Sequence, residues 1–289
     1  MPVREVIRPR TLEDAIEAAG QAGWRMAAGF TDILPAEVDR KFWQGSPDQR
    51  LVDLTGIKAL SGISEDAAWL RIGACTTWRE IAATGLPAGL AALQLAAREV
   101  GSIQIQNRAT LGGNLCNASP AADGVPVLMM LNAEVELRSA AGERRQKLTE
   151  FILGNRQTTL APGEILTAIL IPRVTAGVPS HFAKVGLRRY MIISLVSVAA
   201  AIEVRDGRIA DARIGVGACS PVPVRLRGLE TALRGLTADG SIISCLNAPE
   251  AFVELSPIDD VRATAVYRRQ AARVLTTRAV LDLIRRQAN

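Results

Sequence analysis

The sequence predicts an α+β protein made of a larger first domain and a small second domain of sheet and helix. Helical and strand patterns are mixed up to about residue 171, and a stretch with two prolines and a glycine follows at 172–179. Beyond it, two strand-like runs joined by Asp206 and Gly207 precede two helical runs. With 289 residues, 48% of them hydrophobic, the chain can form a full core in both domains.

The elements of the first domain follow from periodicity and capping residues. Thr11 begins a short amphipathic helix that Gly20 and Gly23 end. Thr77 and Glu80 begin a second helix, and residues 86–100, rich in Ala and Leu, predict a third. A short helix is expected at 125–131. Strands are predicted at 25–28, 51–54, 69–72, 133–138 and 165–171.

The second domain shows a simpler pattern. Residues 196–204 and 208–216 predict two strands of a hairpin, because Asp-Gly is a strong turn signal between them. Residues 226–236 and 261–284 predict helices. In the last one, apolar side chains recur at near-helical spacing, at Tyr267, Ala271, Val274, Leu281 and Ile284.

Charge and composition exclude several classes of protein. The net charge is +5, from 34 basic and 29 acidic residues, and the basic residues are nearly all Arg. They are scattered, and only 4% of the residues are aromatic, so nucleic-acid binding is not expected. No apolar run has the length of a membrane span. We expect a cytoplasmic protein without membrane insertion.

The cysteines and the single histidine restrict the chemistry further. Cys75, Cys116, Cys219 and Cys245 are far apart and form no C-x-x-C motif, which excludes an iron–sulfur or structural zinc site built from this chain alone. We expect free thiols. With His181 as the only histidine, a Ser-His-Asp hydrolase is not indicated, and we expect neither a catalytic constellation nor a metal site.

The segment 109–123 has the composition of a backbone that holds a phosphate ester. Gly112 and Gly113 lack side chains, so their N–H groups can approach an anion and can adopt φ values closed to other residues. Thr110, Asn114 and Asn117 add neutral donors. The segment has no Lys and no G-x-G-x-x-G spacing, so neither a phosphate-loop NTPase nor a dinucleotide fingerprint is indicated. Taken alone, it is also compatible with a plain tight turn.

Three blocks of sequence resemble the FAD-binding subunit of molybdenum hydroxylases, the family of the carbon monoxide dehydrogenase medium subunit and the bacterial xanthine dehydrogenase flavin subunit. The blocks are Ala-Ala-Gly-Phe-Thr-Asp-Ile at 27–33, the segment 107–123, and Phe182-x-Lys184-x-x-x-Arg188. The match runs almost end to end. It implies a vanillyl-alcohol-oxidase-type FAD-binding domain at 1–174, with subdomains at about 1–55 and 56–174, and a C-terminal flavoprotein domain at 175–289.

The resemblance also implies a set of FAD-binding residues. FAD would lie extended between the two subdomains, with its pyrophosphate against both turns. Several aligned neutral donors would share the charge without an arginine. The first turn would contribute Ala27, Ala28, Gly29, Phe30, Thr31, Asp32 and Ile33, and the second Thr110, Gly112, Gly113, Asn114 and Asn117.

For four positions, Asp32 and three further residues, the sequence leaves alternatives open. A carboxylate is repelled by a pyrophosphate, so Asp32 and Asp123 are expected to accept hydrogen bonds from flavin hydroxyls or to fix the turns; Asp123 could instead cap the helix before Val125. Leu166 matches an apolar residue near the isoalloxazine, or is an ordinary core residue. Lys184 matches a lysine close to the flavin, where it would stabilise reduced flavin, or is a surface lysine.

Phe30 departs from the family pattern, because many relatives have a second glycine there. A bulky residue does not adopt φ > 0 cheaply, so we expect the turn to pass through Phe30 with φ < 0.

The resemblance implies an electron-transfer subunit. FAD would receive electrons from [2Fe–2S] clusters in an iron–sulfur subunit, with the molybdopterin in a further subunit, and would pass them to NAD or another acceptor. The assembly would be a dimer of heterotrimers. Phe30 and Lys184 favour a xanthine dehydrogenase type over a carbon monoxide dehydrogenase type. A stand-alone FAD oxidoreductase and a flavin-free assembly subunit are the alternatives.

Overall fold

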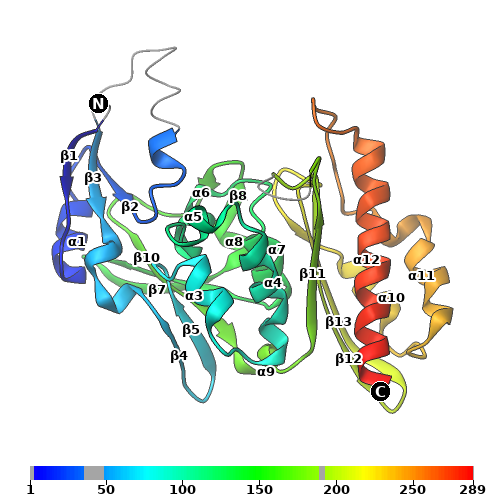
Figure 1. The fold of residues 1–289 in the computed structure, drawn as a ribbon. Coiled ribbons are helices and arrows are strands. Elements are labelled where there is room, and N and C mark those ends of the chain that lie inside the picture. The colour runs from blue at the N-terminus through cyan, green and yellow to red at the C-terminus, as the bar shows by residue number, and fades with distance from the viewer. Residues whose placement is uncertain (1–2, 36–48, 189–192, 289) are drawn as a thin grey trace.

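The computed structural model describes residues 3–35, 49–188 and 193–288. The chain begins with a small parallel sheet of order β1-β3-β2, made of β1 (Val3–Ile7), β2 (Trp24–Ala27) and β3 (Gln49–Asp53), with α1 (Leu12–Ala19) between its first two strands. Thr11 caps α1 by accepting a hydrogen bond from the Asp14 N–H, as its sequence predicts. Figure 1 shows this sheet at one end of the molecule, near the N-terminus.

A five-stranded antiparallel sheet follows, with the order β4-β5-β10-β6-β7. Its strands are β4 (Ile63–Glu65), β5 (Trp69–Gly73), β10 (Ile165–Pro172), β6 (Glu134–Ser139) and β7 (Gly142–Lys147). Its central strand β10 is almost entirely buried. The helices connected to this sheet are α3 (Trp78–Ala83), α4 (Ala91–Glu99), α5 (Ile103–Gln106), α6 (Leu111–Asn117), α7 (Gly124–Met130), α8 (Leu148–Phe151) and α9 (Arg173–Ala176).

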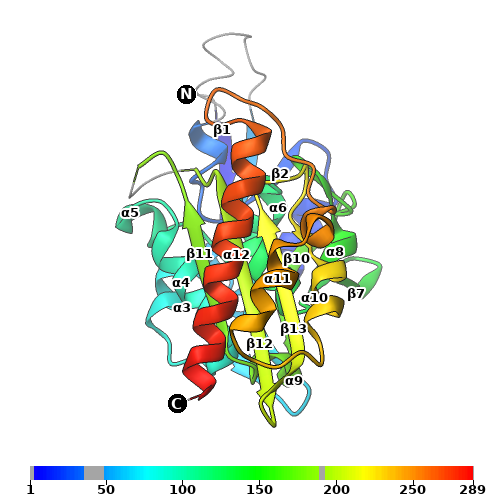
Figure 2. The same ribbon diagram turned by 90° about the vertical axis from the view of Figure 1, so that its right-hand side faces the viewer.

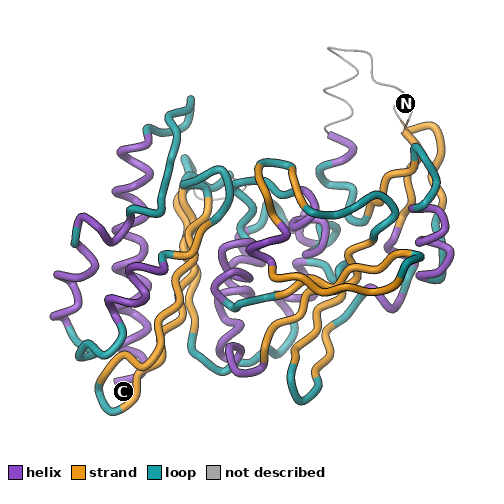
Figure 3. The backbone as a smooth tube through the Cα atoms, turned by 180° about the vertical axis from the view of Figure 1, so that it is seen from behind, coloured by secondary structure: helices purple, strands orange, loops and turns teal. Residues whose placement is uncertain are grey.

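The last part of the chain forms a four-stranded antiparallel sheet of order β11-β12-β13-β14. It consists of β11 (Ser180–Val185), β12 (Val196–Arg205), β13 (Arg208–Gly217) and β14 (Val224–Arg225), and α10 (Arg227–Leu233), α11 (Ile243–Asn247) and α12 (Ala265–Ala288) cover one face. The tube in Figure 3 shows that α4 and α7 lie between this sheet and the five-stranded one. A small ribbon of β8 (Ile152–Gly154) and β9 (Gln157–Thr158) completes these sheets.

Strand β12 is buried on both faces and so joins the layer of α4 and α7 to the layer of α12. Ala199 and Ala201 face the core shared with α4 and α7, whereas Val198, Ala200 and Ile202 face the core under α12. A strand with both faces buried needs a nearly continuous apolar run, which the sequence of β12 provides. The molecule is therefore a series of layers rather than two separate bodies.

Most elements predicted from the sequence are confirmed, with two changes of extent. The helix predicted at 86–100 is divided into a 3-10 turn (Ala88–Leu90) and α4. The last helix begins at Ala265, not at residue 261, because Asp260 accepts hydrogen bonds from the Arg262 and Ala263 N–H groups and holds a loop there. The elements additional to the prediction are strands β1, β4, β7, β8, β9, β11 and β14 and the short helices α5, α6, α8, α9 and α11.

Candidate cofactor site

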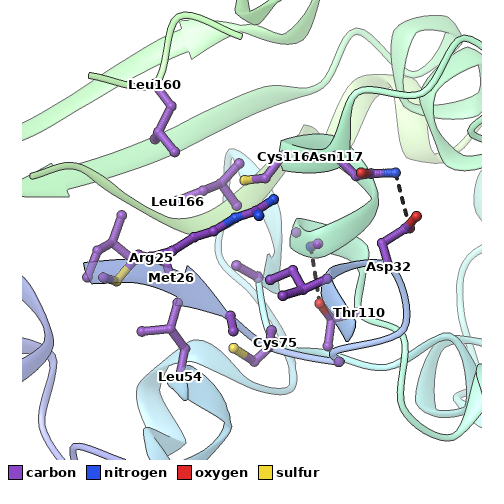
Figure 4. A pocket seen from close by; sticks show the side chains of 18 of the residues that line it. Arg25, Met26, Asp32, Leu54, Cys75, Thr110, Cys116, Asn117, Leu160 and Leu166 are labelled. Carbon is purple, nitrogen blue, oxygen red and sulfur yellow. Dashed lines mark hydrogen bonds between the residues drawn. The ribbon is translucent and has the colours of Figure 1, made fainter. Parts of the chain in front are cut away.

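A cavity of about 790 Å³ lies between the first turn of the chain and helix α6. This volume is within the range of roughly 300–1,000 Å³ that is usual for ligand sites. Strands β2 and β10, the loops that precede and follow β2, the loop before β10 and helix α6 contribute to its lining, and Figure 4 shows some of the side chains. Its lining includes residues 19–33, Thr110, Gly112–Asn114, Cys116, Asn117 and residues 160–166.

The first side of the cavity is the turn that follows β2. At Gly29 a Cβ atom would collide with the backbone of Arg108, so only glycine allows the two sides of the cavity to approach this closely. Phe30 adopts φ +63°, in the left-handed region. The expectation of φ < 0 at Phe30 is therefore wrong: the turn keeps the conformation that a glycine would favour, and the preceding residue, Gly29, packs closely against the backbone of Arg108 and Ala109.

The second side is the beginning of α6. Thr110 is its N-cap, and its Oγ1 accepts a hydrogen bond from the Gly113 N–H at 3.1 Å. Gly112 and Gly113 lie inside the first turn of this helix and do not have positive φ. The missing side chains let other groups lie close to the helix. A Cβ at Gly112 would lie 2.7 Å from Ala74, whereas one at Gly113 would meet only the Thr110 hydroxyl. The Gly112 surface packs inward and the Gly113 surface is exposed in the cavity.

The side formed by β2 and its turn offers donors that suit a ligand with phosphates. The N–H groups of Thr31 and Asp32 donate to no other described residue. Two buried side-chain atoms of the lining, Trp24 Nε1 and Asn114 Oδ1, also have no partner among the described residues. Unsatisfied buried groups of this kind are costly unless a ligand or water completes them.

The remaining wall is mostly apolar, with Arg25, Gln21 and Glu164 as polar members of the lining. Leu160 and Leu166 point into the cavity from the loop before β10 and from β10 itself, and the Cys75 thiol lies on the opposite side (Figure 4). Burial raises the pKa of Cys75 to about 12, so it is a neutral apolar group at physiological pH. The side chain of Arg25 reaches into the same cavity from β2. Sequence reasoning did not include Arg25 because its strand pattern indicates burial, and only the fold shows where its guanidinium lies.

The other two expected residues are joined to each other rather than exposed in the cavity. Lys184 Nζ donates to Asp123 Oδ2 at 2.7 Å and to the Glu99 carbonyl, and Ser194 Oγ donates to Asp123 Oδ1 at 2.6 Å. Both members of the pair are more than 90% buried, so Lys184 is not a surface lysine. Asp123 occupies the N-cap position of α7 but caps no N–H with its side chain. Burial raises the pKa of Asp123, while Lys184 opposes the shift.

Comparison with known proteins identifies the family. Residues 2–174 match the model of the FAD binding domain in molybdopterin dehydrogenase. The chain belongs to this family. FAD is its cofactor, and the cavity fits that cofactor in size, in glycine-lined close approach and in unpaired polar groups. Residues 181–283 match the CO dehydrogenase flavoprotein C-terminal domain.

Individual relatives cover nearly the whole chain. The chain is similar to the glyceraldehyde dehydrogenase medium chain of Sulfolobus acidocaldarius, at 29% identity over 98% of this chain and 99% of the relative. It is 33% identical to the nicotinate dehydrogenase FAD-subunit of Eubacterium barkeri, over 80% of this chain and 79% of that one. Among solved structures, a chain of the Cu,Mo-CO dehydrogenase superposes with a TM-score of 0.90 at 27% identity, covering 99% of this chain and 100% of the other.

The fold class expected from the resemblance is confirmed by these matches. The protein is an FAD subunit of the molybdenum hydroxylase family. No helix among the described residues has both the length and the apolarity needed to cross a membrane.

Proposed function

We propose that this chain carries electrons through FAD within a cytoplasmic molybdenum hydroxylase complex. An iron–sulfur subunit would deliver electrons from [2Fe–2S] clusters, a molybdopterin subunit would oxidise the substrate, and NAD or another acceptor would receive the electrons. The complex would be a dimer of heterotrimers. The observation that carries the proposal is the cavity between two backbone turns in a chain whose relatives are medium and FAD subunits.

Within this proposal the residues of the chain bind and orient the cofactor. FAD supplies the electron-transfer chemistry when bound. The turn at Gly29–Asp32 would hold its pyrophosphate by the backbone N–H groups of Thr31 and Asp32. The N–H groups of Leu111, Gly112, Gly113 and Asn114 already donate within the protein, so the first turn of α6 would contribute close approach at the exposed Gly113 instead. Arg25 would add positive charge in the cavity. Leu160 and Leu166 would exclude water from the apolar part. The chain would divide into FAD-binding residues 1–174 and a C-terminal domain at 175–289.

For the reaction of the whole complex we propose a xanthine dehydrogenase type. Phe30 supports it, because the resemblance described above associates this position with that type. Lys184 supports it less than the sequence suggested, because Asp123 neutralises its charge. The superposition on a chain of the Cu,Mo-CO dehydrogenase favours a carbon monoxide dehydrogenase type as the second candidate. Turnover of the purified complex with xanthine and with carbon monoxide separates the two.

The placement of FAD is tested by two neighbouring glycines. Gly113→Leu fills the exposed side of α6, so we expect the purified protein to lose the flavin absorbance of the wild type while its far-ultraviolet circular dichroism stays unchanged. Gly112→Leu, the control, collides with Ala74 and should lower the thermal midpoint of the FAD-free protein. Flavin retained at wild-type stoichiometry in Gly113→Leu would contradict this placement.

A further inference from the structure

We propose that Asp32, Asn117 and Arg156 form a bridge that retains FAD by holding the two sides of its cavity together. Asn117 Nδ2 donates to Asp32 Oδ2 at 3.1 Å, and Arg156 Nη1 donates to Asn117 Oδ1 at 2.9 Å. The Arg156 guanidinium also lies 3.9 Å from Asp32 Oδ1. The inference rests on FAD binding as proposed above, and it assigns to Arg156 a positioning role that its sequence does not indicate.

The bridge joins three segments that are far apart in the sequence. Asp32 belongs to the strained turn after β2, Asn117 to the last turn of α6, and Arg156 to the turn between β8 and β9. In Figure 4, a dashed line joins Asn117, at the end of α6, to Asp32 on the turn after β2, at one edge of the cavity. Both side chains line the cavity, so the bond between them spans its edge.

The backbone fixes Arg156 in place for this contact. Its N–H donates to the Ala118 carbonyl at 2.9 Å, and Ala118 ends α6 in the left-handed region with φ +46°. Arg156 itself has φ +57°. Two non-glycine residues in this region are unusual and persist only where the surroundings hold them. The guanidinium is therefore presented to Asn117 by a fixed turn rather than by a freely moving side chain.

The contacts of the bridge add little to the stability of the fold, but they connect the two sides of the cavity. Asp32 and Arg156 are 56% and 57% exposed, so their ion pair contributes little to the stability of the fold. Asn117, however, has both ends of its amide occupied and stands between the two sides. Breaking the bridge should let the Phe30 turn move away from α6, which opens the cavity without unfolding the protein. Its effect is therefore expected on FAD release and not on the stability of the FAD-free chain.

The experiment measures the rate of FAD release from the full chain. Flavin fluorescence increases as FAD leaves the protein, and strong dilution keeps the released cofactor from binding again. We expect Asn117→Ala to raise the dissociation rate constant about tenfold and Arg156→Ala about threefold, since each lost hydrogen bond has a modest net effect. The double variant should release FAD no faster than Asn117→Ala, because the contacts act as one unit.

Three further measurements make the result specific. Arg138→Ala is the matched control, because it also removes an exposed, ion-paired arginine, from the β6–β7 hairpin; it should leave the rate within twofold of wild type. Arg156→Lys keeps the charge but loses the planar fork, and should release FAD about as fast as Arg156→Ala. The thermal midpoint of the FAD-free protein should stay within about 2 °C in every variant, as expected for exposed polar contacts.

Different outcomes would contradict the bridge, the role of Arg156 or the proposed function. Wild-type release in Asn117→Ala, or a lower midpoint of the FAD-free protein with unchanged release, would overturn the bridge. Wild-type release in Arg156→Lys would show that charge alone acts and would overturn the positioning role of Arg156. A wild-type chain that binds no FAD at all would instead contradict the proposed function.

Discussion

At the scale of single residues, the turn at Phe30 holds a phenylalanine in a costly backbone conformation. A left-handed φ costs a residue other than glycine about 1–2 kcal/mol, and Phe30 has φ +63°. Gly29 packs against the Arg108 backbone on one side, and Asp32 is bonded to Asn117 on the other. These two contacts, which also shape the cofactor cavity, therefore offset the free-energy cost of the left-handed conformation.

This strain can be measured with two substitutions of similar size. Asn tolerates the left-handed region, whereas β-branched Val does not. We expect Phe30→Val to be less stable than Phe30→Asn by about 1 kcal/mol in urea unfolding of the FAD-free protein, although Val is the more apolar side chain. Equal stability, or a more stable Val variant, would show that the turn passes through φ < 0.

The pair of Asp123 and Lys184 is a second feature at this scale. Lys184→Met leaves the Asp123 carboxylate buried with Ser194 as its partner, and should cost about 3–5 kcal/mol of unfolding free energy. Burial raises the pKa of Asp123 above its usual value, and removing Lys184 raises it further. A carboxyl whose pKa is raised on folding favours the folded state at low pH and loses that contribution as pH rises. The loss in Lys184→Met should therefore be larger at pH 8 than at pH 5, and Asp123→Asn/Lys184→Met should recover most of it. The same loss at both pH values would contradict this account.

At the scale of elements, the sequence predicted the places of the main helices and strands well, and the backbone conformation of the glycine segment less well. Strong signals such as the Thr77–Glu80 capping box and the Asp206–Gly207 hairpin appear where they were expected. The Gly112–Gly113 segment was interpreted as a turn in which glycine permits unusual φ values, but it is helical, because Thr110 caps it and Gly112 serves close packing. The places of the Arg25 and Arg156 side chains depend on tertiary contacts, so the sequence around these residues does not predict them.

The beginning of α12 offers a test by pH. The Arg262 N–H, followed by the Ala263 N–H and the Arg268 guanidinium, lowers the pKa of Asp260 to about 2. Arg268 in turn donates to the Leu195 and Ala218 carbonyls and holds the loops beside Asp123. A carboxyl with a lowered pKa stabilises the fold above its unfolded value near 4 and loses this contribution as pH falls toward 2. Asp260→Asn should thus be less stable than wild type at pH 6, and urea midpoints should converge as pH falls below 4. A constant difference down to pH 3 would show that charge on Asp260 plays no part.

At the scale of the whole molecule, buried arginines join the four-stranded sheet to the layer of helices beneath it. Arg225 forms an ion pair with Glu230 and donates to the Met129 carbonyl and to Asn132. Arg213 donates to the Met130 carbonyl at the same end of α7. Cations at a helix C-terminus are favourable, and here they come from the part of the chain that matches the C-terminal family model. They fix the four-stranded sheet to α7, the helix that follows α6 in the chain.

We therefore expect Arg225 to contribute strongly to the unfolding free energy of the protein, although it does not line the cavity. Arg225→Met leaves Glu230 buried without its main partner and should cost about 3–5 kcal/mol in urea unfolding. Arg225→Lys should recover less than half of the loss, because an ammonium group cannot reproduce the two parallel bonds to Glu230 together with the contact to α7. Arg234→Ala, which removes an exposed ion pair with Asp211 in the same sheet, should cost less than about 1 kcal/mol. A loss in Arg225→Met as small as that in Arg234→Ala would mean that apolar contacts of β12 and β13 alone hold the layers together.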